Sequence, residues 1–191
     1  MTAGKAVEAR VPTSRLVSGA GVMSALVAVL TVTAFPLPPP LSTITLAPFA
    51  MFVTGVYFGP WVGLIASAVG SGVGFVVAVN LGSINLGGLS VLFPIFLLGI
   101  IVARGPEGLI IGLLRRSSEI GAMVVGTIYE TLAFFTIDFF YTYPILLVLP
   151  RDLAFLDFGT VVDLVYIIPA VIALRYLRKN LGRRYYYRPV L

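Results

Sequence analysis

The sequence predicts an all-α protein that crosses a membrane six times, with both chain ends in the cytoplasm. Of its 191 residues, 59% are hydrophobic and only 11% are charged, and the mean hydropathy is +1.04. Soluble domains carry about 25% charged residues, so we expect this chain to lie in lipid. Its apolar runs give six candidate helices, and nearly all of its basic residues fall on one side of the membrane that these helices would cross.

The apolar runs and the residues that interrupt them set the expected order of elements. Residues 1–15 are a polar N-terminal tail, residues 16–180 a single six-helix membrane domain, and residues 181–191 a basic C-terminal tail. Within the domain, helices are expected at residues 16–35, 46–58, 60–80, 89–114, 119–141 and 158–179.

The second and third helices are predicted to form a tight hairpin at Gly59-Pro60. Glycine readily takes the left-handed conformation that ends one helix, and proline suits the first turn of the next. At about 1.5 Å per residue, the helix at 46–58 covers only about 20 Å of a hydrocarbon layer of about 30 Å. A span that falls short leaves a depression that neighbouring protein must shelter from lipid.

Proline and glycine also mark the loops and the irregular helices. Three consecutive prolines in the outer loop at 36–45 favour stiff, extended backbone, which could act as a lid. The other outer connections are residues 79–88 and 142–157. In the fourth helix, Pro106 predicts a kink or break, across which Arg104 and Glu107 are expected to pair near the cytoplasmic end. Pro169 is expected to kink the sixth helix.

The basic residues predict the orientation. Of the 13 Lys and Arg residues, only Arg151 falls on the outer side, and Arg104 lies just inside the inner face. The positive-inside rule then places both tails in the cytoplasm. This distribution explains the net charge of +5 without nucleic acid as a partner. The basic, aromatic C-terminal tail suits the anionic inner leaflet of a plasma membrane.

Composition also argues against enzymatic functions. Cys and His are absent, which removes disulfides, zinc sites, Ser-His and Cys-His nucleophile pairs and histidine proton relays. No G-x-x-x-x-G-K-[ST] phosphate loop occurs. We therefore predict no catalytic residue, no metal and no cofactor, and the protein is not expected to be an enzyme.

Acidic residues within the spans are the best clues to a binding site, because an Asp near the bilayer centre costs about 2.5 to 3.5 kcal/mol on insertion scales. Glu130 is expected near the midplane, with Asp138 and Asp163 closer to the outer surface and at similar depth. With polar and aromatic neighbours they would line a pocket open to the outside. The predicted set is Asn80, Asn85, Glu130, Phe134, Asp138, Tyr141, Asp163 and Tyr166. The alternative is that Asp138 and Asp163 are interfacial groups in water, that Tyr141 belongs to an aromatic belt, and that Glu130 is protonated and hydrogen-bonded within the bundle.

A row of small residues follows the first helix at four-residue spacing. Ala20, Ser24 and Ala28 would let another helix approach its backbone closely. The approaching helix could belong to this chain or to another subunit, and spacing alone favours packing within the chain.

These features resemble the substrate-binding membrane subunit, or S component, of an energy-coupling factor transporter. The resemblance covers the six spans with cytoplasmic ends, the small-residue row, the loop that leads into LAPFAMFVTGVYFGPWVGLI and the segment GPEGLIIGLL. The small-residue row and GPEGLIIGLL are similar to the branch that includes riboflavin-type S components.

The resemblance implies a bundle that captures a vitamin or related micronutrient at its outer face, with flavin as the first guess. It also implies three partners, namely a transmembrane coupling subunit and two ATPases. The family's docking signature would map onto Ala20, Ser24 and Ala28, with Ser in place of one Ala, and this favours a docking surface there.

The predicted function is therefore substrate capture. Ligand would bind from outside beneath the loop at 36–45, and ATP hydrolysis by the partners would drive its release inward. Two alternatives stay open. A self-sufficient secondary carrier or channel would use Glu130, the acidic candidate at the midplane. A membrane assembly subunit would bind no ligand at all.

Overall fold

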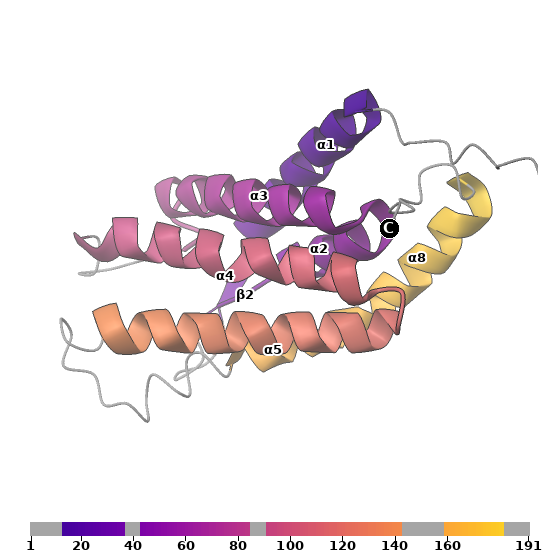
Figure 1. The fold of residues 1–191 in the computed structure, drawn as a ribbon. Coiled ribbons are helices and arrows are strands. Elements are labelled where there is room, and N and C mark those ends of the chain that lie inside the picture. The colour runs from indigo at the N-terminus through magenta and orange to yellow at the C-terminus, as the bar shows by residue number, and fades with distance from the viewer. Residues whose placement is uncertain (1–12, 37–42, 85–90, 143–158, 182–191) are drawn as a thin grey trace, which may run out of the picture.

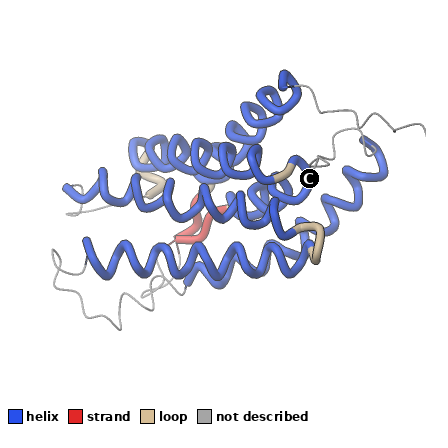
Figure 2. Tube along the Cα trace, in the orientation of Figure 1, coloured by secondary structure: helices blue, strands red, loops and turns tan. Residues whose placement is uncertain are grey.

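The computed structural model is a bundle of helices, four of which are long and apolar enough to cross a membrane (Figures 1 and 2). It describes residues 13–36, 43–84, 91–142 and 159–181. The helices are α1 (Thr13–Val32), α2 (Ala47–Phe58), α3 (Pro60–Asn80), α4 (Phe93–Leu114), α5 (Glu119–Ile137) and α8 (Ile167–Leu181). A π-helical turn, η2 (Asp138–Thr142), continues α5, and a 3₁₀ helix, η3 (Gly159–Tyr166), leads into α8.

The all-α class is confirmed, with candidate spans at Pro60–Asn80, Phe93–Leu114, Glu119–Tyr141 and Thr160–Asn180. The apolar parts of the other two helices, Leu16–Val32 and Ala47–Phe58, are shorter. Residues 1–12 and 182–191, which make up most of the two predicted tails, lie outside the described residues.

The hairpin between α2 and α3 forms where the sequence predicts it. Gly59 has φ = 97°, a conformation that side chains with a Cβ rarely adopt, and Pro60 opens α3. The 12 residues of α2 cover about 18 Å. The prediction of a short second helix is therefore confirmed.

Glycines let α3 approach α1 at backbone distance. A Cβ added at Gly70 would lie 2.6 Å from the carbonyl oxygen of Ser24, and one at Gly74 would lie 2.7 Å from that of Ala28. The small-residue row of α1 therefore faces α3 and Ala20 is buried, as the internal-packing alternative expects. Ser24 and Ala28 stay partly exposed, and the neighbouring face of α1 exposes Val22 and other apolar residues.

The two ends of the loop between α1 and α2 pair with each other as a short β-hairpin. β1 (Ala34–Pro36) pairs antiparallel with β2 (Thr43–Thr45), and residues 37–42, the middle of the predicted lid, lie outside the described residues. The prediction that the first helix reaches residue 35 is wrong. Pro36 pushes the preceding residue toward extended backbone, so the helix stops at Val32. β2 lies against η3.

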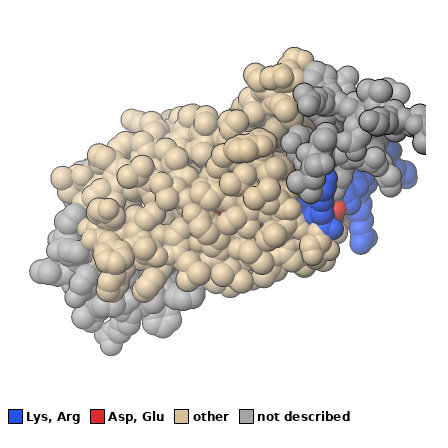
Figure 3. All heavy atoms as spheres, in the orientation of Figure 1, with Lys and Arg blue, Asp and Glu red and all other residues tan. Residues whose placement is uncertain are grey.

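The basic side chains of the helix ends gather at one end of the bundle, here called the basic end (Figure 3). Arg178 at the end of α8 pairs with Glu119 at the start of α5. The buried Arg115 donates from Nη1 to the carbonyl oxygen of Val56, at 2.7 Å, at the C-terminus of α2. A cation at a helix C-terminus complements the helix dipole, so Arg115 fastens the α4–α5 turn to the α2–α3 turn.

The main apolar core fills the half of the bundle next to the basic end. It is formed by α2, α4, α5 and α8, through Phe52, Val53, Val56, Tyr57, Ile111, Ala122, Met123, Ala170 and Leu174. Beyond this core, charged side chains begin one helical turn from Ile111 on α4 and two turns from Met123 on α5.

Candidate functional site

A buried ion pair joins α4 and α5. Arg104 Nε donates to Glu130 Oε1 at 2.9 Å, and the two side chains are 11% and 0% exposed. Arg104 is the twelfth of 22 residues in α4, so it lies about 15 Å from each end of the helix. The pair therefore sits halfway along the apolar helices, where ionised side chains are most costly in lipid.

Of the kink or break predicted at Pro106, the break is wrong, since α4 is continuous through this residue. Proline has no N–H to donate to the carbonyl oxygen four residues earlier, which belongs to Val102. The hydroxyl of Tyr129 on α5 donates to that oxygen at 3.3 Å. A neighbouring helix thus satisfies the backbone group that Pro106 frees, which is how prolines are tolerated in membrane helices.

The expected pairing of Arg104 with Glu107 near the cytoplasmic end is also wrong. Glu107 is fully buried, and neither of its carboxylate oxygens has a hydrogen-bond partner in the described structure. Its side chain turns toward α5, where a Cβ on Gly126 would lie 3.2 Å from Glu107 Cγ. The same Cβ would lie 2.6 Å from Ile111 Cγ1, so Gly126 makes room for both side chains of α4.

Asp163 approaches the same place from η3. It is 5% exposed and lies close enough to Glu130 and Arg104 to interact with both electrostatically. The prediction that Asp163 lies at the depth of Asp138 is wrong. η3 begins beside Thr131, whose hydroxyl is 2.6 Å from that of Thr160, about 15 Å along the helix from Tyr141. The sixth helical segment therefore starts deep in the bundle.

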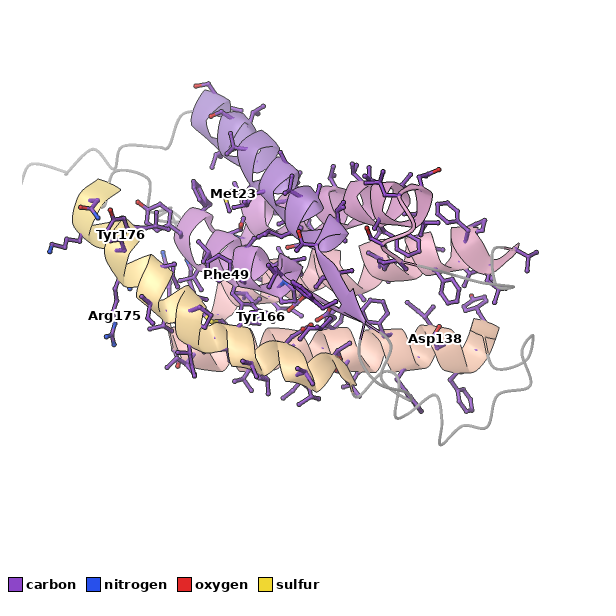
Figure 4. All side chains as sticks on the ribbon, turned by 180° about the vertical axis from the view of Figure 1, so that it is seen from behind. Met23, Phe49, Asp138, Tyr166, Arg175 and Tyr176 are labelled. Carbon is purple, nitrogen blue, oxygen red and sulfur yellow. The ribbon has the colours of Figure 1, made fainter. Side chains whose placement is uncertain are left out.

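The 3₁₀ conformation of η3 presents its polar residues in one row. With three residues per turn, side chains three apart are aligned along the helix, so Thr160, Asp163 and Tyr166 share one face. Thr160 contacts α5 and the half-buried Tyr166 packs against the apolar core. Figure 4 shows Tyr166 near Phe49 of α2. The conformation ends just before Pro169, the residue at which the sequence predicts a kink.

Together these residues form what is here called the Arg104 cluster: Arg104, Glu107, Glu130 and Asp163. They come from three helical segments and interact with one another electrostatically. One guanidinium faces three carboxyl groups. Among the residues that the structure describes, no three acidic side chains converge closely enough to hold a metal ion.

The structure divides the predicted binding set. Glu130 and Asp163 come together, with Tyr166 on the same face as Asp163, and the half-buried Phe134 lies one turn beyond Glu130. The remaining predicted residues that the structure describes lie apart from these.

Asp138 begins η2, about 12 Å along the helix from Glu130, and Figure 4 shows it toward the far end of α5. Tyr141 is 58% exposed. Asn80 is exposed and donates to the carbonyl oxygen of Val76 in its own helix. Asn85 lies outside the described residues. None of the three described residues is thus placed beside the Arg104 cluster.

Sequence reasoning missed two members of the cluster, Arg104 and Glu107. Their position in the sequence was the available signal, because they lie three residues apart in the middle of a 22-residue apolar helix. Charged residues at such positions in membrane helices almost always face the bundle interior. The spacing of Thr160, Asp163 and Tyr166 at every third position was the signal for the 3₁₀ row.

No family model, curated protein or solved structure matches this chain.

Proposed function

We propose that the chain is the substrate-capture subunit of an energy-coupling factor importer in the plasma membrane. In this proposal it crosses the membrane six times with cytoplasmic tails, and it binds a vitamin or related micronutrient. A transmembrane coupling subunit and two ATPases then drive release of the ligand inward. The Arg104 cluster carries the proposal, since it is a charged site buried within apolar helices.

Stability alone does not account for the cluster. Each charged side chain near the bilayer centre is costly, and apolar residues of similar volume often stabilise a protein as well as a buried ion pair does. Ionisable residues within membrane helices typically mark substrate or ion sites. The cluster therefore supports a binding function better than a purely structural one.

The proposed orientation puts the basic end in the cytoplasm, following the positive-inside rule. Both α2 and η3 then begin near the middle of the bundle rather than at its outer surface. A ligand would reach the Arg104 cluster from outside, between the β1–β2 hairpin and the outer parts of α4 and α5. Phe134 and Tyr166 are the aromatic residues available there to stack on a flat ring.

A second candidate is a self-sufficient secondary carrier. The observation that favours it is the mid-membrane position of the buried Glu107 and Glu130, where ion-coupled carriers keep carboxylates. Solute flux in proteoliposomes that contain this chain alone would favour the carrier. Flux only with the coupling subunit and ATPases would favour the importer.

Thermal unfolding of the purified protein with a panel of vitamins, riboflavin first, tests the proposed function. We expect one compound to raise the unfolding temperature of the wild type and of Glu119→Gln, which changes an acid at the basic end. Glu130→Gln should abolish that shift. If no compound shifts the wild type and no small molecule copurifies with it, the proposal is overturned.

A further inference from the structure

We infer that the Arg104 cluster binds a ligand that carries a positive charge, an organic amine or guanidine, and that the Glu107 carboxylate receives it. This inference rests on the proposed function and narrows its ligand class. Uncharged flavins become poor candidates, although they remain compatible with the proposed function itself.

The cluster holds three carboxyl groups and a single cation. Arg104 is its single basic member, and Glu130 Oε1 takes the Arg104 hydrogen bond at 2.9 Å. The remaining basic residues whose side chains are described belong to the basic end: Arg115, Arg116, Arg175, Arg178 and Lys179. Burial without a counter-charge disfavours an ionised carboxyl group, and a cationic ligand would supply that counter-charge for Glu107 and Asp163.

Glu107 is the group that points to a ligand. Both of its oxygens are buried without a hydrogen-bond partner in the described structure, and Glu130 Oε2 is likewise unpartnered. Glu107 lies close enough to Glu130, Arg104 and Asp163 to interact electrostatically with all three. Three carboxylate oxygens are thus ready to accept hydrogen bonds.

Hydrogen-bond acceptors select a ligand with N–H donors. Protonated amines and guanidines combine a positive charge with several donors, and their hydrogen bonds to carboxylates are among the strong ones in proteins. The described acidic residues do not converge on one point, as the ligands of a metal ion must. This arrangement suits a ligand whose N–H donors lie several ångströms apart. Tyr166, on the face of η3 that carries Asp163, offers a ring that can contact a cation.

Access would be from the side of Arg104 and Asp163. These two side chains keep small exposed fractions, whereas Glu107 and Glu130 have none. A cation would therefore meet Asp163 first and reach Glu107 only as η3 shifts away from α5. Thr131 and Thr160 form the direct hydroxyl contact that such a shift would break.

Calorimetric titration of the purified protein with four probes at neutral pH tests the inference. N-butylguanidinium and butylammonium each carry one positive charge, while N-butylurea and butan-1-ol are their uncharged counterparts. We expect the cations to bind at least about tenfold more tightly, the factor that one charged hydrogen bond typically supplies. Glu107→Gln should remove the preference for cations, and Glu119→Gln, a matched change at the basic end, should preserve it.

Each other result is informative. If the uncharged probes bind as well as the cations, or Glu107→Gln leaves the preference intact while the variant keeps the elution volume of the wild type, the inference is overturned. If a neutral vitamin binds and Glu130→Gln abolishes that binding, the proposed function stands without this inference. Arg151→Ala tests a counter-charge from the loop before η3, and cation binding that appears only in this variant would also overturn the inference.

Discussion

Arg104 Nε and Glu130 Oε1, 2.9 Å apart, join α4 and α5 halfway along their length. The Glu130 side chain is fully buried, so its charge depends on Arg104 for compensation. Breaking a buried pair by removing one partner is far more costly than replacing both, because a lone buried charge is left behind. This asymmetry gives the pair a measurable signature.

Arg104→Met should lower the free energy of unfolding by about 3 to 5 kcal/mol, since three carboxyl groups would then share no cation. Adding Glu130→Gln to that variant should restore part of the loss. Reversible unfolding of the two single variants and the double variant in detergent micelles gives the coupling energy. Losses that simply add would contradict the direct pairing.

Tyr129→Phe should destabilise the protein by about 0.6 to 2 kcal/mol, the range measured for hydrogen bonds between membrane helices. The lost hydroxyl bonds the carbonyl oxygen of Val102, which has no helical donor because of Pro106. Pro106→Ala returns an N–H to α4, so Tyr129→Phe should cost clearly less in that background. An equal cost in both backgrounds would show that the tyrosine has another role.

Gly74→Ala should destabilise the packing of α1 on α3 by about 1 to 3 kcal/mol, as overpacking typically does. The new Cβ would lie 2.7 Å from the carbonyl oxygen of Ala28. Gly21→Ala is the matched control, because a Cβ there meets nothing within 4 Å. Thermal unfolding should leave Gly21→Ala unchanged or slightly stabilised, since alanine favours helix. Equal melting of both variants would argue against this helix contact.

The absence of Cys from the sequence allows a direct test of the proposed orientation. Ser83→Cys lies just beyond α3 and Ser117→Cys in the α4–α5 turn, both at exposed positions. In intact cells, a membrane-impermeant maleimide should label Ser83→Cys at once and Ser117→Cys only after permeabilisation. The reverse pattern would place the basic end outside and contradict the proposed topology.

The regular helices were predictable because local chemistry sets their bounds. The expected helix at 60–80 coincides with α3, since Gly59-Pro60 both ends α2 and begins the next helix. The hairpin β1–β2 was less predictable. An apolar run that reads as one helix to residue 35 contains β-branched residues before Pro36, and these favour extended backbone.

The candidate site was predicted only in part, because the depth of each residue in the membrane was judged from its distance to the expected ends of its helix. Glu130 and Asp163 were both members of the predicted binding set. Arg104 was placed near the inner face, as a partner of Glu107 across a kink or break at Pro106. Instead α4 continues through Pro106, supported by the hydroxyl of Tyr129, which is distant in sequence. Asp163 was placed too far out because a helical run does not reveal at which depth it starts. Tertiary contacts decide both points.

Native mass spectrometry of the protein purified from its membrane tests the central claim most directly, since it detects a ligand held by the Arg104 cluster without prior choice of compound. The wild type and Glu119→Gln should each carry a small molecule of one mass, and Glu130→Gln should appear as the bare chain. A bound molecule retained equally by Glu130→Gln, or a bare chain in all three proteins, would contradict the claim.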